Sequence, residues 1–164
     1  MNDSISKALI DQANHELFAA HSYHAMALWC ATKDYSGFSK FFLKQAEEER
    51  EHAEKFIDHI LDRGGFPAIT AIAAPQIEFG SLGEIALKAK ALEKANSDAI
   101  KKCYEISLET KDYESQRMLL WFIDEQVEEE AWTEKMVTLV KRMECPGAAY
   151  TLDRHIMKEL APDE

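Results

Sequence analysis

Gln45-Ala46-Glu47-Glu48-Glu49-Arg50-Glu51-His52 is the most informative segment of this chain. It lies inside an apolar pattern in which Phe38 and Phe56 share one helix face with Glu49 and His52. An ionised carboxylate is costly to bury in an apolar core unless a partner compensates it. The segment therefore predicts a helix whose buried face carries a polar site.

Three other helix-length segments have the same build. In each, apolar residues recur in alternating steps of four and three, and a glutamate interrupts the stripe near its middle. The interrupting residues are Glu16, Glu93 and Glu129. The pattern predicts an all-α protein, with long helices over 3–32, 36–63, 82–110 and 112–142 and a short amphipathic helix over 148–160.

The connection between the second and third long helices is unusually long. Residues 64–81 contain Gly65, Pro67 and Pro75 and end in a capping box, Ser81-Leu82-Gly83-Glu84. Extended at about 3.3 Å per residue, they reach roughly 59 Å, whereas a helix of about 28 residues is roughly 42 Å long. The segment can cross the bundle and make these two helices parallel, which predicts a four-helix bundle with one long crossover.

The chain of 164 residues suits one domain with a sizeable core. We expect residues 1–145 to form the bundle, and residues 146–164 to add a short helix and a tail to that same domain. The short helix has more apolar surface than it needs against its own bundle, which predicts a subunit interface. Its apolar residues are Tyr150, Leu152, Ile156, Met157 and Leu160.

Two turns in the sequence are nearly identical. Thr32-Lys33-Asp34-Tyr35 recurs as Thr110-Lys111-Asp112-Tyr113, and Asp112 is a suitable N-cap for the fourth helix. Counted from each threonine, Glu49 lies 17 residues on and Gln126 lies 16 residues on. Either similar turns select similar capping residues, or the bundle has a pseudo-two-fold repeat in which ligand positions match.

The composition narrows the possible partners. The formal charge is −11, from 30 acidic and 19 basic residues, which disfavours nucleic acid and favours cations. Cys30, Cys103 and Cys145 form no CxxC pair, as expected for reduced thiols in a cytoplasm. The N-terminus has no signal-peptide pattern, and no apolar run approaches the ~20 residues of a membrane helix. We therefore expect a cytoplasmic protein without a membrane partner.

The polar positions have the spacing of metal ligands. Glu49 and His52 form an E-x-x-H motif, and Gln126 and Glu129 form a Q-x-x-E at the corresponding place on another helix. One glutamate from each remaining helix completes the ligand pattern of di-metal carboxylate bundles, apart from the second histidine. Carboxylate and imidazole suit iron or manganese. Two metals about 3.5–4 Å apart need a bridging ligand, for which Glu49 is the candidate.

The chain resembles the non-haem bacterial ferritins over essentially its whole length. The resemblance rests on Asn14-His15-Glu16-Leu17, Tyr23, residues 46–52, Glu93 and residues 121–130. It implies a ferritin-like fold and a set of iron ligands within one subunit. By this resemblance, one iron of a ferroxidase centre is held by Glu16, Glu49 and His52. Glu49 bridges to a second iron, which is held by Glu93 and Glu129 with Gln126 beside it. The resemblance also implies a third, outer iron site formed by Glu48, Glu125 and Glu128, and a redox-active Tyr23.

The same resemblance implies an iron-storage subunit with ferroxidase activity. Such a subunit oxidises Fe(II) with dioxygen or peroxide and deposits ferric mineral inside a homo-oligomeric cage, a 24-mer. No haem is expected, because Arg50 stands where bacterioferritins carry a haem-binding Met and the second motif lacks a histidine. One alternative is a metal-binding or structural cage without ferroxidase turnover. Another, a DNA-binding mini-ferritin, is disfavoured by the ligand set within one subunit and by the fifth helix.

Overall fold

The computed structural model describes residues 1–143 and 145–160, which form helices joined by turns and one long connection, with no strand. The predicted all-α class is confirmed. The helix ends fall close to their expected places, and α5 begins two residues earlier than predicted, with Pro146 at its first position, where a missing N–H costs nothing. The helices are α1 (Asp3–Thr32), α2 (Ser36–Asp62), α3 (Leu82–Glu109), α4 (Tyr113–Lys141) and α5 (Pro146–Leu160).

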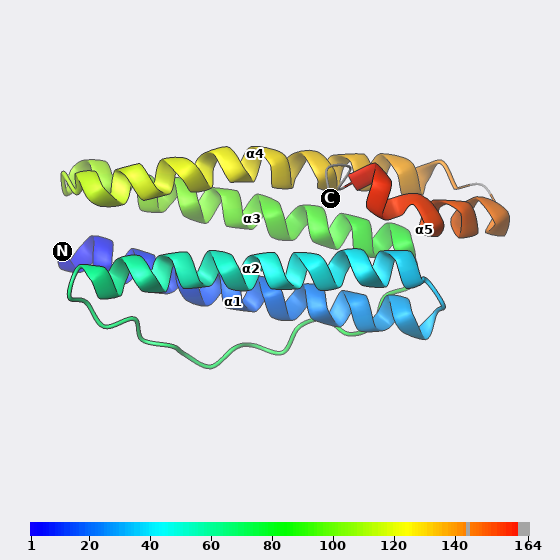
Figure 1. The fold of residues 1–164 in the computed structure, drawn as a ribbon, viewed down its shortest axis with the longest axis horizontal. Helices are drawn as coiled ribbons and strands as arrows, with labels where there is room; N and C mark the ends of the chain where they lie inside the picture. Colours follow the sequence, from blue (N-terminus) through cyan, green and yellow to red (C-terminus); the bar gives the residue numbers. More distant parts are fainter. Residues whose placement is uncertain (144, 161–164) are drawn as a thin grey trace.

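The four long helices form two antiparallel pairs, α1 with α2 and α3 with α4 (Figure 1). The connection between α2 and α3 runs along the outside of the first pair from one end of the bundle to the other, so α2 and α3 are parallel, as predicted (Figure 1). Asn14 of α1 fixes its path: the side-chain amide donates to the Ala68 carbonyl oxygen at 2.9 Å and accepts from the Thr70 amide at 2.8 Å.

The two turns that resemble each other in sequence are equivalent in structure after a shift of one residue. The Tyr35 amide donates to the Cys30 carbonyl, and the Asp112 amide donates to the Ser107 carbonyl, both at 2.9 Å. Tyr35 and Asp112 are therefore the matching N-caps of α2 and α4. Counted from these caps, Glu49 and Gln126 each lie 14 residues on, which removes the mismatch in the sequence count and supports the pseudo-two-fold interpretation.

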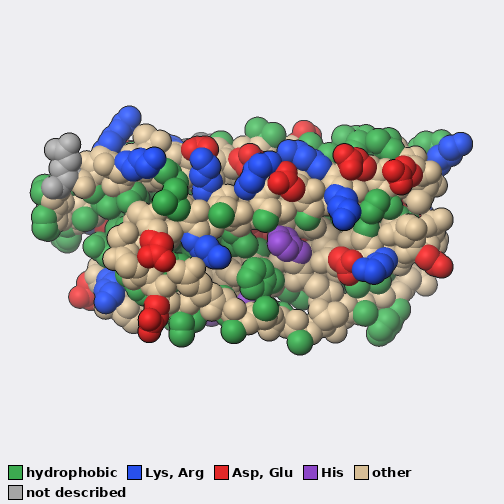
Figure 2. Space-filling model, turned by 180° about the vertical axis from the view of Figure 1, so that it is seen from behind, with side chains coloured by type: hydrophobic (Ala, Val, Ile, Leu, Met, Phe, Trp, Pro, Cys, Tyr) green, Lys and Arg blue, Asp and Glu red, His purple; other side chains and the backbone are tan. Residues whose placement is uncertain are grey.

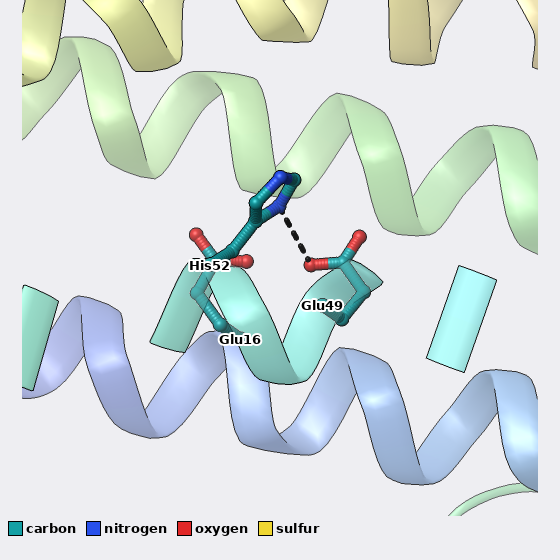
Figure 3. Close-up of side chains that lie close together, drawn as sticks. All are labelled: Glu16, Glu49 and His52. Atoms are coloured by element: carbon teal, nitrogen blue, oxygen red, sulfur yellow. Dashed lines mark ion pairs between the residues drawn. The ribbon is translucent and has the colours of Figure 1, made fainter. Parts of the chain in front are cut away.

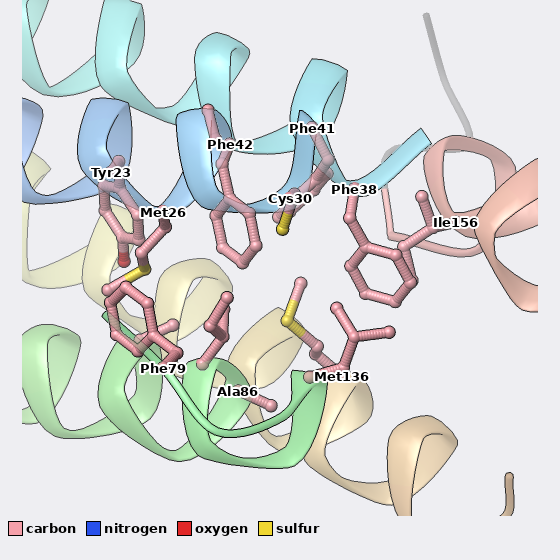
Figure 4. Close-up of a cluster of buried hydrophobic side chains, with 14 of the residues drawn as sticks. Tyr23, Met26, Cys30, Phe38, Phe41, Phe42, Phe79, Ala86, Met136 and Ile156 are labelled. Atoms are coloured by element: carbon pink, nitrogen blue, oxygen red, sulfur yellow. The ribbon is translucent and has the colours of Figure 1, made fainter. Parts of the chain in front are cut away.

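Polar side chains in mid-bundle separate two apolar clusters. The larger cluster includes Tyr23, Phe42 and Met136 and lies toward α5, with Ile156 of that helix as a member (Figure 4). The other contains Leu9 and Phe122 and lies toward the opposite end. The stripe residues named from the sequence are all buried, namely Phe38, Glu49, His52 and Phe56 on α2 and Glu16, Glu93 and Glu129 on the other long helices. The bundle therefore holds its polar layer between two apolar layers that exclude water.

The short helix α5 caps the start of α2. Tyr35 makes no side-chain capping bond, and the Phe38 amide instead donates to the Asp153 carboxylate of α5 at 3.0 Å. Gly37 permits this close approach, since a methyl group there would lie 1.7 Å from the Asp153 carbonyl oxygen. The corresponding amide of α4, at Ser115, is capped by Asp112 of its own turn at 3.0 Å.

On the face seen in Figure 2, acidic and basic side chains alternate along one long edge of the molecule, with hydrophobic side chains between them. Ion pairs form both along and between helices, as in Lys94 with Asp98 and Lys90 with Glu134. Among the helices of the described residues, none combines the length and apolar character that crossing a membrane requires.

Candidate metal centre

Each of the four long helices places one carboxylate in the middle of the bundle, and α2 adds an imidazole. All five side chains are buried although they are ionisable, so their placement needs a compensating partner. Their exposed fractions are 0% for Glu16, 1% for Glu49, 2% for His52, 0% for Glu93 and 4% for Glu129.

These side chains form two groups that share one residue. In the first group, ligand atoms of Glu16, Glu49 and His52 all lie within 4.8 Å of one another. Figure 3 shows them converging from α1 and α2. In the second group, Glu49 lies within the same limit of Glu93 and Glu129. Because both groups contain Glu49, the structure places it where a ligand bridging two metal ions would stand.

Most carboxylates of the centre are held by neighbouring donors. Glu93 accepts from the Tyr23 hydroxyl and, at 3.2 Å, from the Gln126 side-chain amide. Glu129 accepts from the Trp132 indole N–H. Glu16 accepts from two buried amides. These bonds fix the carboxylate positions before any metal ion binds.

Four buried side-chain polar atoms have no hydrogen-bond partner among the described residues; one is His15 Nε2, and the other three lie at the centre. These three are Glu49 Oε2, His52 Nδ1 and Gln126 Oε1. The first two lie 3.5 Å apart and face each other (Figure 3). Buried polar groups are normally satisfied, so unpaired acceptors that converge are what a metal site presents in its apo form. One imidazole among oxygen ligands suits iron or manganese.

The electrostatics of the metal-free centre agree with a cation site. Burial, followed by repulsion from Glu93 and Glu16, raises the pKa of Glu49 well above its usual range. Burial and repulsion from Glu93 likewise raise the pKa of Glu129. Burial raises the pKa of Glu93 to about 7 and lowers the pKa of His52, which keeps the imidazole neutral and able to bind a metal.

The predicted outer residues are only partly brought together. Glu48 and Glu125, both half-buried, gather around His52 with ligand atoms within 4.8 Å of one another. Glu128 is exposed and lies outside this group. Burial and repulsion from Glu48 raise the pKa of Glu125. The histidine of the inner centre therefore also faces the outer residues, which the sequence did not indicate.

Sequence reasoning missed three residues that hydrogen-bond carboxylates of the inner centre. Gln12 and Asn96 bond Glu16, and Trp132 bonds Glu129. Asn96 lies on the buried stripe of α3, and Gln12 and Trp132 lie four residues before and three residues after the ligand they contact. A polar residue one helical turn from a predicted ligand, or on the same buried stripe, was the sequence signal that could have identified them.

The fold and the buried carboxylates define a ferritin-like four-helix bundle with a candidate di-metal centre. The protein-family model of the ferritin-like domain matches residues 6–143 of this chain. A bacterial non-heme ferritin of Staphylococcus aureus (strain MRSA252) is 41% identical over 143 residues, covering 87% of this chain and 86% of the relative. One from Staphylococcus saprophyticus has the same identity and coverage.

Solved structures agree with the sequence relatives. The open pore ferritin of the archaeon Archaeoglobus fulgidus superposes with a TM-score of 0.93 at 29% identity, covering 95% of this chain and 96% of that chain. A humanized archaeal ferritin gives a TM-score of 0.93, also at 29% identity. The chain belongs to the ferritin family. The expected function class, iron storage, is confirmed at this level.

Proposed function

We propose that this protein is a ferroxidase as well as an iron store, and that oxidation takes place at the Glu16–Glu49–His52 and Glu49–Glu93–Glu129 groups of a single subunit. The observation that carries the proposal is the pair of buried ligand groups sharing Glu49, with unpartnered acceptor atoms on Glu49 and His52. Manganese fits the same ligands, but membership of the ferritin family favours iron.

The side chains have distinct tasks in this proposal. Two Fe(II) ions held side by side supply two electrons to dioxygen or hydrogen peroxide. Glu16 and neutral His52 bind on one side, Glu93 and Glu129 bind on the other, and Glu49 joins the two. Gln126 presents its unpaired Oε1 beside the second group. The raised pKa values mean that carboxyl groups of the centre can give up protons when iron binds. The resulting carboxylates balance the positive charge of the iron, which grows as Fe(II) becomes Fe(III).

Two further elements complete the site. Tyr23 is fully buried and donates its hydroxyl hydrogen to Glu93, a position from which it can supply an electron and that proton. Glu48 and Glu125, whose ligand atoms lie within 4.8 Å of each other and of His52, support a third iron site. We propose that the exposed Glu128 contributes to this site from outside the group. Iron leaving the inner pair can pass outward through these residues.

The proposal is tested by adding Fe(II) in air and following the near-ultraviolet absorbance of the ferric product. Glu49→Ala should lose fast oxidation by about 100-fold, because neither ion keeps its shared ligand. The matched control is Glu51→Ala, which removes the same charge from an exposed position two residues on and should oxidise iron like the wild type. Fast oxidation in Glu49→Ala contradicts the assignment.

The same preparation separates the proposal from a cage that binds iron without turnover. In that alternative, wild-type protein binds Fe(II) anaerobically but oxidises it in air no faster than buffer does.

Counting bound iron also tests the third site: a Glu48→Ala, Glu125→Ala double variant should bind about one ion fewer per subunit than wild type, while its first oxidation stays fast. An unchanged count contradicts the outer site.

The proposal extends to the whole chain. Family membership supports a cage-forming homo-oligomer, and we propose a 24-mer around a ferric mineral. We propose that α5, the described part of residues 146–164, belongs to the same domain as residues 1–145, supported by its packing on α2 and α4; the predicted tail over 161–164 lies outside the described residues. The thiols of Cys30, Cys103 and Cys145 are free, which supports a cytoplasmic location.

A further inference from the structure

A closed set of hydrogen bonds holds the carboxylate of Glu16. The Gln12 side-chain amide donates to Glu16 Oε1 at 2.8 Å and to Asn96 Oδ1 at 2.6 Å. The Asn96 amide in turn donates to Glu16 Oε2 at 2.9 Å. All three side chains are at most 2% exposed, so water does not compete for these bonds. Both oxygens of this one carboxylate are therefore fixed by the protein.

The arrangement leaves little freedom in the orientation of either amide. Both hydrogens of the Gln12 amino group are used, and Asn96 offers its oxygen to Gln12 and its nitrogen to Glu16. Turning either amide over would place an oxygen against a carboxylate or carbonyl oxygen. The donors are also neutral. Unlike Arg or Lys, they orient the carboxylate without cancelling the charge that a cation needs.

The bonds also join two helices and separate the centre from a surface cavity. Gln12 and Glu16 lie on α1 and Asn96 lies on α3, so the bonds fix the spacing of helices that supply ligands to different halves of the centre. On its other side Gln12 lines an open cavity of about 400 Å³ between α1 and α3. It is therefore part of the wall between that cavity and Glu16.

The other ligands of the same group are not held in this way. Glu49 Oε2 and His52 Nδ1 have no hydrogen-bond partner. Glu16 thus enters metal binding with both oxygens held by amides, whereas Glu49 and His52 each keep one buried polar atom without a partner. A preoriented ligand avoids the loss of rotamer freedom that an unrestrained glutamate pays when it binds.

We propose that Gln12 and Asn96 are positioning residues that set the metal affinity of the Glu16–Glu49–His52 half of the centre through Glu16. They do not contact the metal ion themselves. The inference rests on the proposed function, since it assumes that these three side chains bind metal together.

The test is a titration of the full-length protein with Co(II), which is not oxidised by the centre as Fe(II) is and whose visible absorption reports its ligands. Wild-type protein should bind two ions in the buried centre, besides any ion at the outer Glu48–Glu125 site, and Glu16→Ala identifies the step that belongs to the imidazole half, because Glu16 belongs to that group alone. Asn96→Leu should weaken that same step about 10–100-fold, the usual effect of removing a group that orients a metal ligand, and leave the other step within about twofold.

Ser97→Ala is the matched control. Ser97 is the next residue on α3, is 1% exposed, and accepts from Gln126 at 3.1 Å rather than from Glu16. It should leave the imidazole step unchanged. Gln12→Met keeps nearly the same side-chain volume and removes the other amide that donates to Glu16. It should weaken the same binding step, and it replaces Asn96→Leu as the test if that variant does not fold.

Unchanged Co(II) binding in folded Asn96→Leu or Gln12→Met overturns the inference, and so does a loss of thermal stability without a loss of affinity, because the amides would then serve packing alone. Failure of the proposed function is distinguishable: wild-type protein would itself bind no pair of ions.

Discussion

Glu93 makes metal binding depend on pH near neutrality. Burial raises its pKa to about 7, and the pKa values of Glu49 and Glu129 are raised well above their usual range. A carboxyl with a raised pKa keeps its proton to higher pH, so an incoming cation must displace protons below about pH 7.

Zn(II) or Co(II) affinity should therefore increase as the pH rises from about 5 through about 7, with proton release that is largest at the low end of this range. Calorimetry in two buffers of different ionisation enthalpy measures both quantities. Glu93→Gln removes one titrating ligand and should release fewer protons. Affinity that stays constant across this range would mean that the carboxylates are already ionised in the metal-free protein.

Tyr23 connects the second half of the centre to an aromatic cluster. Its hydroxyl donates to Glu93, and its ring lies 6.0 Å from those of Phe42 and Trp132. Tyr23→Phe keeps the ring and removes the hydrogen bond and the transferable proton. We expect Fe(II) oxidation to slow about tenfold, comparable to one hydrogen bond to a charged group, and any transient tyrosyl radical to disappear.

Stopped-flow absorbance and freeze-quenched electron paramagnetic resonance measure these two effects. The control is Tyr35→Phe, since Tyr35 packs against Phe38 at the start of α2, away from the carboxylates. If Tyr23→Phe oxidises iron at the wild-type rate, the tyrosine is a packing residue.

The capping residues determine how the helices begin. The contribution of one of them, Asp112, to stability can be measured separately because it depends on pH. Asp112 accepts from the Ser115 amide at 3.0 Å and pairs with Arg63 at the end of α2. Burial alone would raise the pKa of Asp112, but hydrogen bonds from Arg63 and Ser115 outweigh it and lower this pKa to about 2. A carboxyl with a lowered pKa stabilises the fold above its unfolded-state pKa of about 4, and this contribution is lost as the pH falls through about 2.

Asp112→Ala should therefore lower the free energy of unfolding at pH 7 by about 1–2 kcal/mol, as for other N-cap losses. The difference from wild type should shrink below about pH 4. Denaturant unfolding at both pH values measures it on metal-free protein. The control is Asp34→Asn, which removes a carboxylate from the equivalent turn and tolerates the φ of 60° found there. A difference that is constant with pH would assign the loss to packing.

Much of the architecture at the level of the helices follows from local sequence. The four-and-three spacing places the stripes, and Ser81 and Asp112 mark helix starts, because these signals act within one turn. Two capping details could not be predicted. Glu84 reaches back to the Gly80 amide rather than to that of Ser81, and α2 is capped by Asp153, which is 115 residues from Phe38 in sequence.

The same limit applies to the candidate site. Glu16, Glu49, Glu93 and Glu129 could be identified because each interrupts an apolar stripe. Asn96 lies on such a stripe as well, but its contact with Glu16 joins residues 80 apart. No local spacing says which helix faces which, so the amide network required the three-dimensional arrangement.

The whole molecule has apolar surface that one subunit does not cover. Phe66 and Ile77 of the long connection are 81% and 67% exposed, and Tyr150 of α5 is 63% exposed. The other α5 residues expected to mark an interface pack against the bundle instead: Leu152, Ile156, Met157 and Leu160. Apolar groups exposed on this scale usually mark protein interfaces. Their position supports the proposed cage, in which both segments contact neighbouring subunits.

Gly37→Ala tests whether the placement of α5 controls assembly. The added methyl group would lie 1.7 Å from the Asp153 carbonyl oxygen, so α5 must move away from α2. Light scattering should give about 450 kDa for the wild type, which is 24 times 18.7 kDa, and a much smaller species for the variant. The first iron oxidation should persist, because the candidate ligands Glu16, Glu49, Glu93 and Glu129 come from the four long helices. The short helix α5 lies at one end of the bundle (Figure 1).

Gly83→Ala is the control for Gly37→Ala, since a methyl group there meets its nearest atom at 3.5 Å, an ordinary contact. It should assemble like the wild type. Asp153→Asn separates the capping charge from the steric effect: it keeps the shape of the side chain, weakens the interaction with the start of α2, and should give an intermediate loss of assembly. A Gly37→Ala protein that still forms the full-size particle would show that the cage closes without α5 in this position, and would place the assembly interface on the four long helices and the connection between α2 and α3.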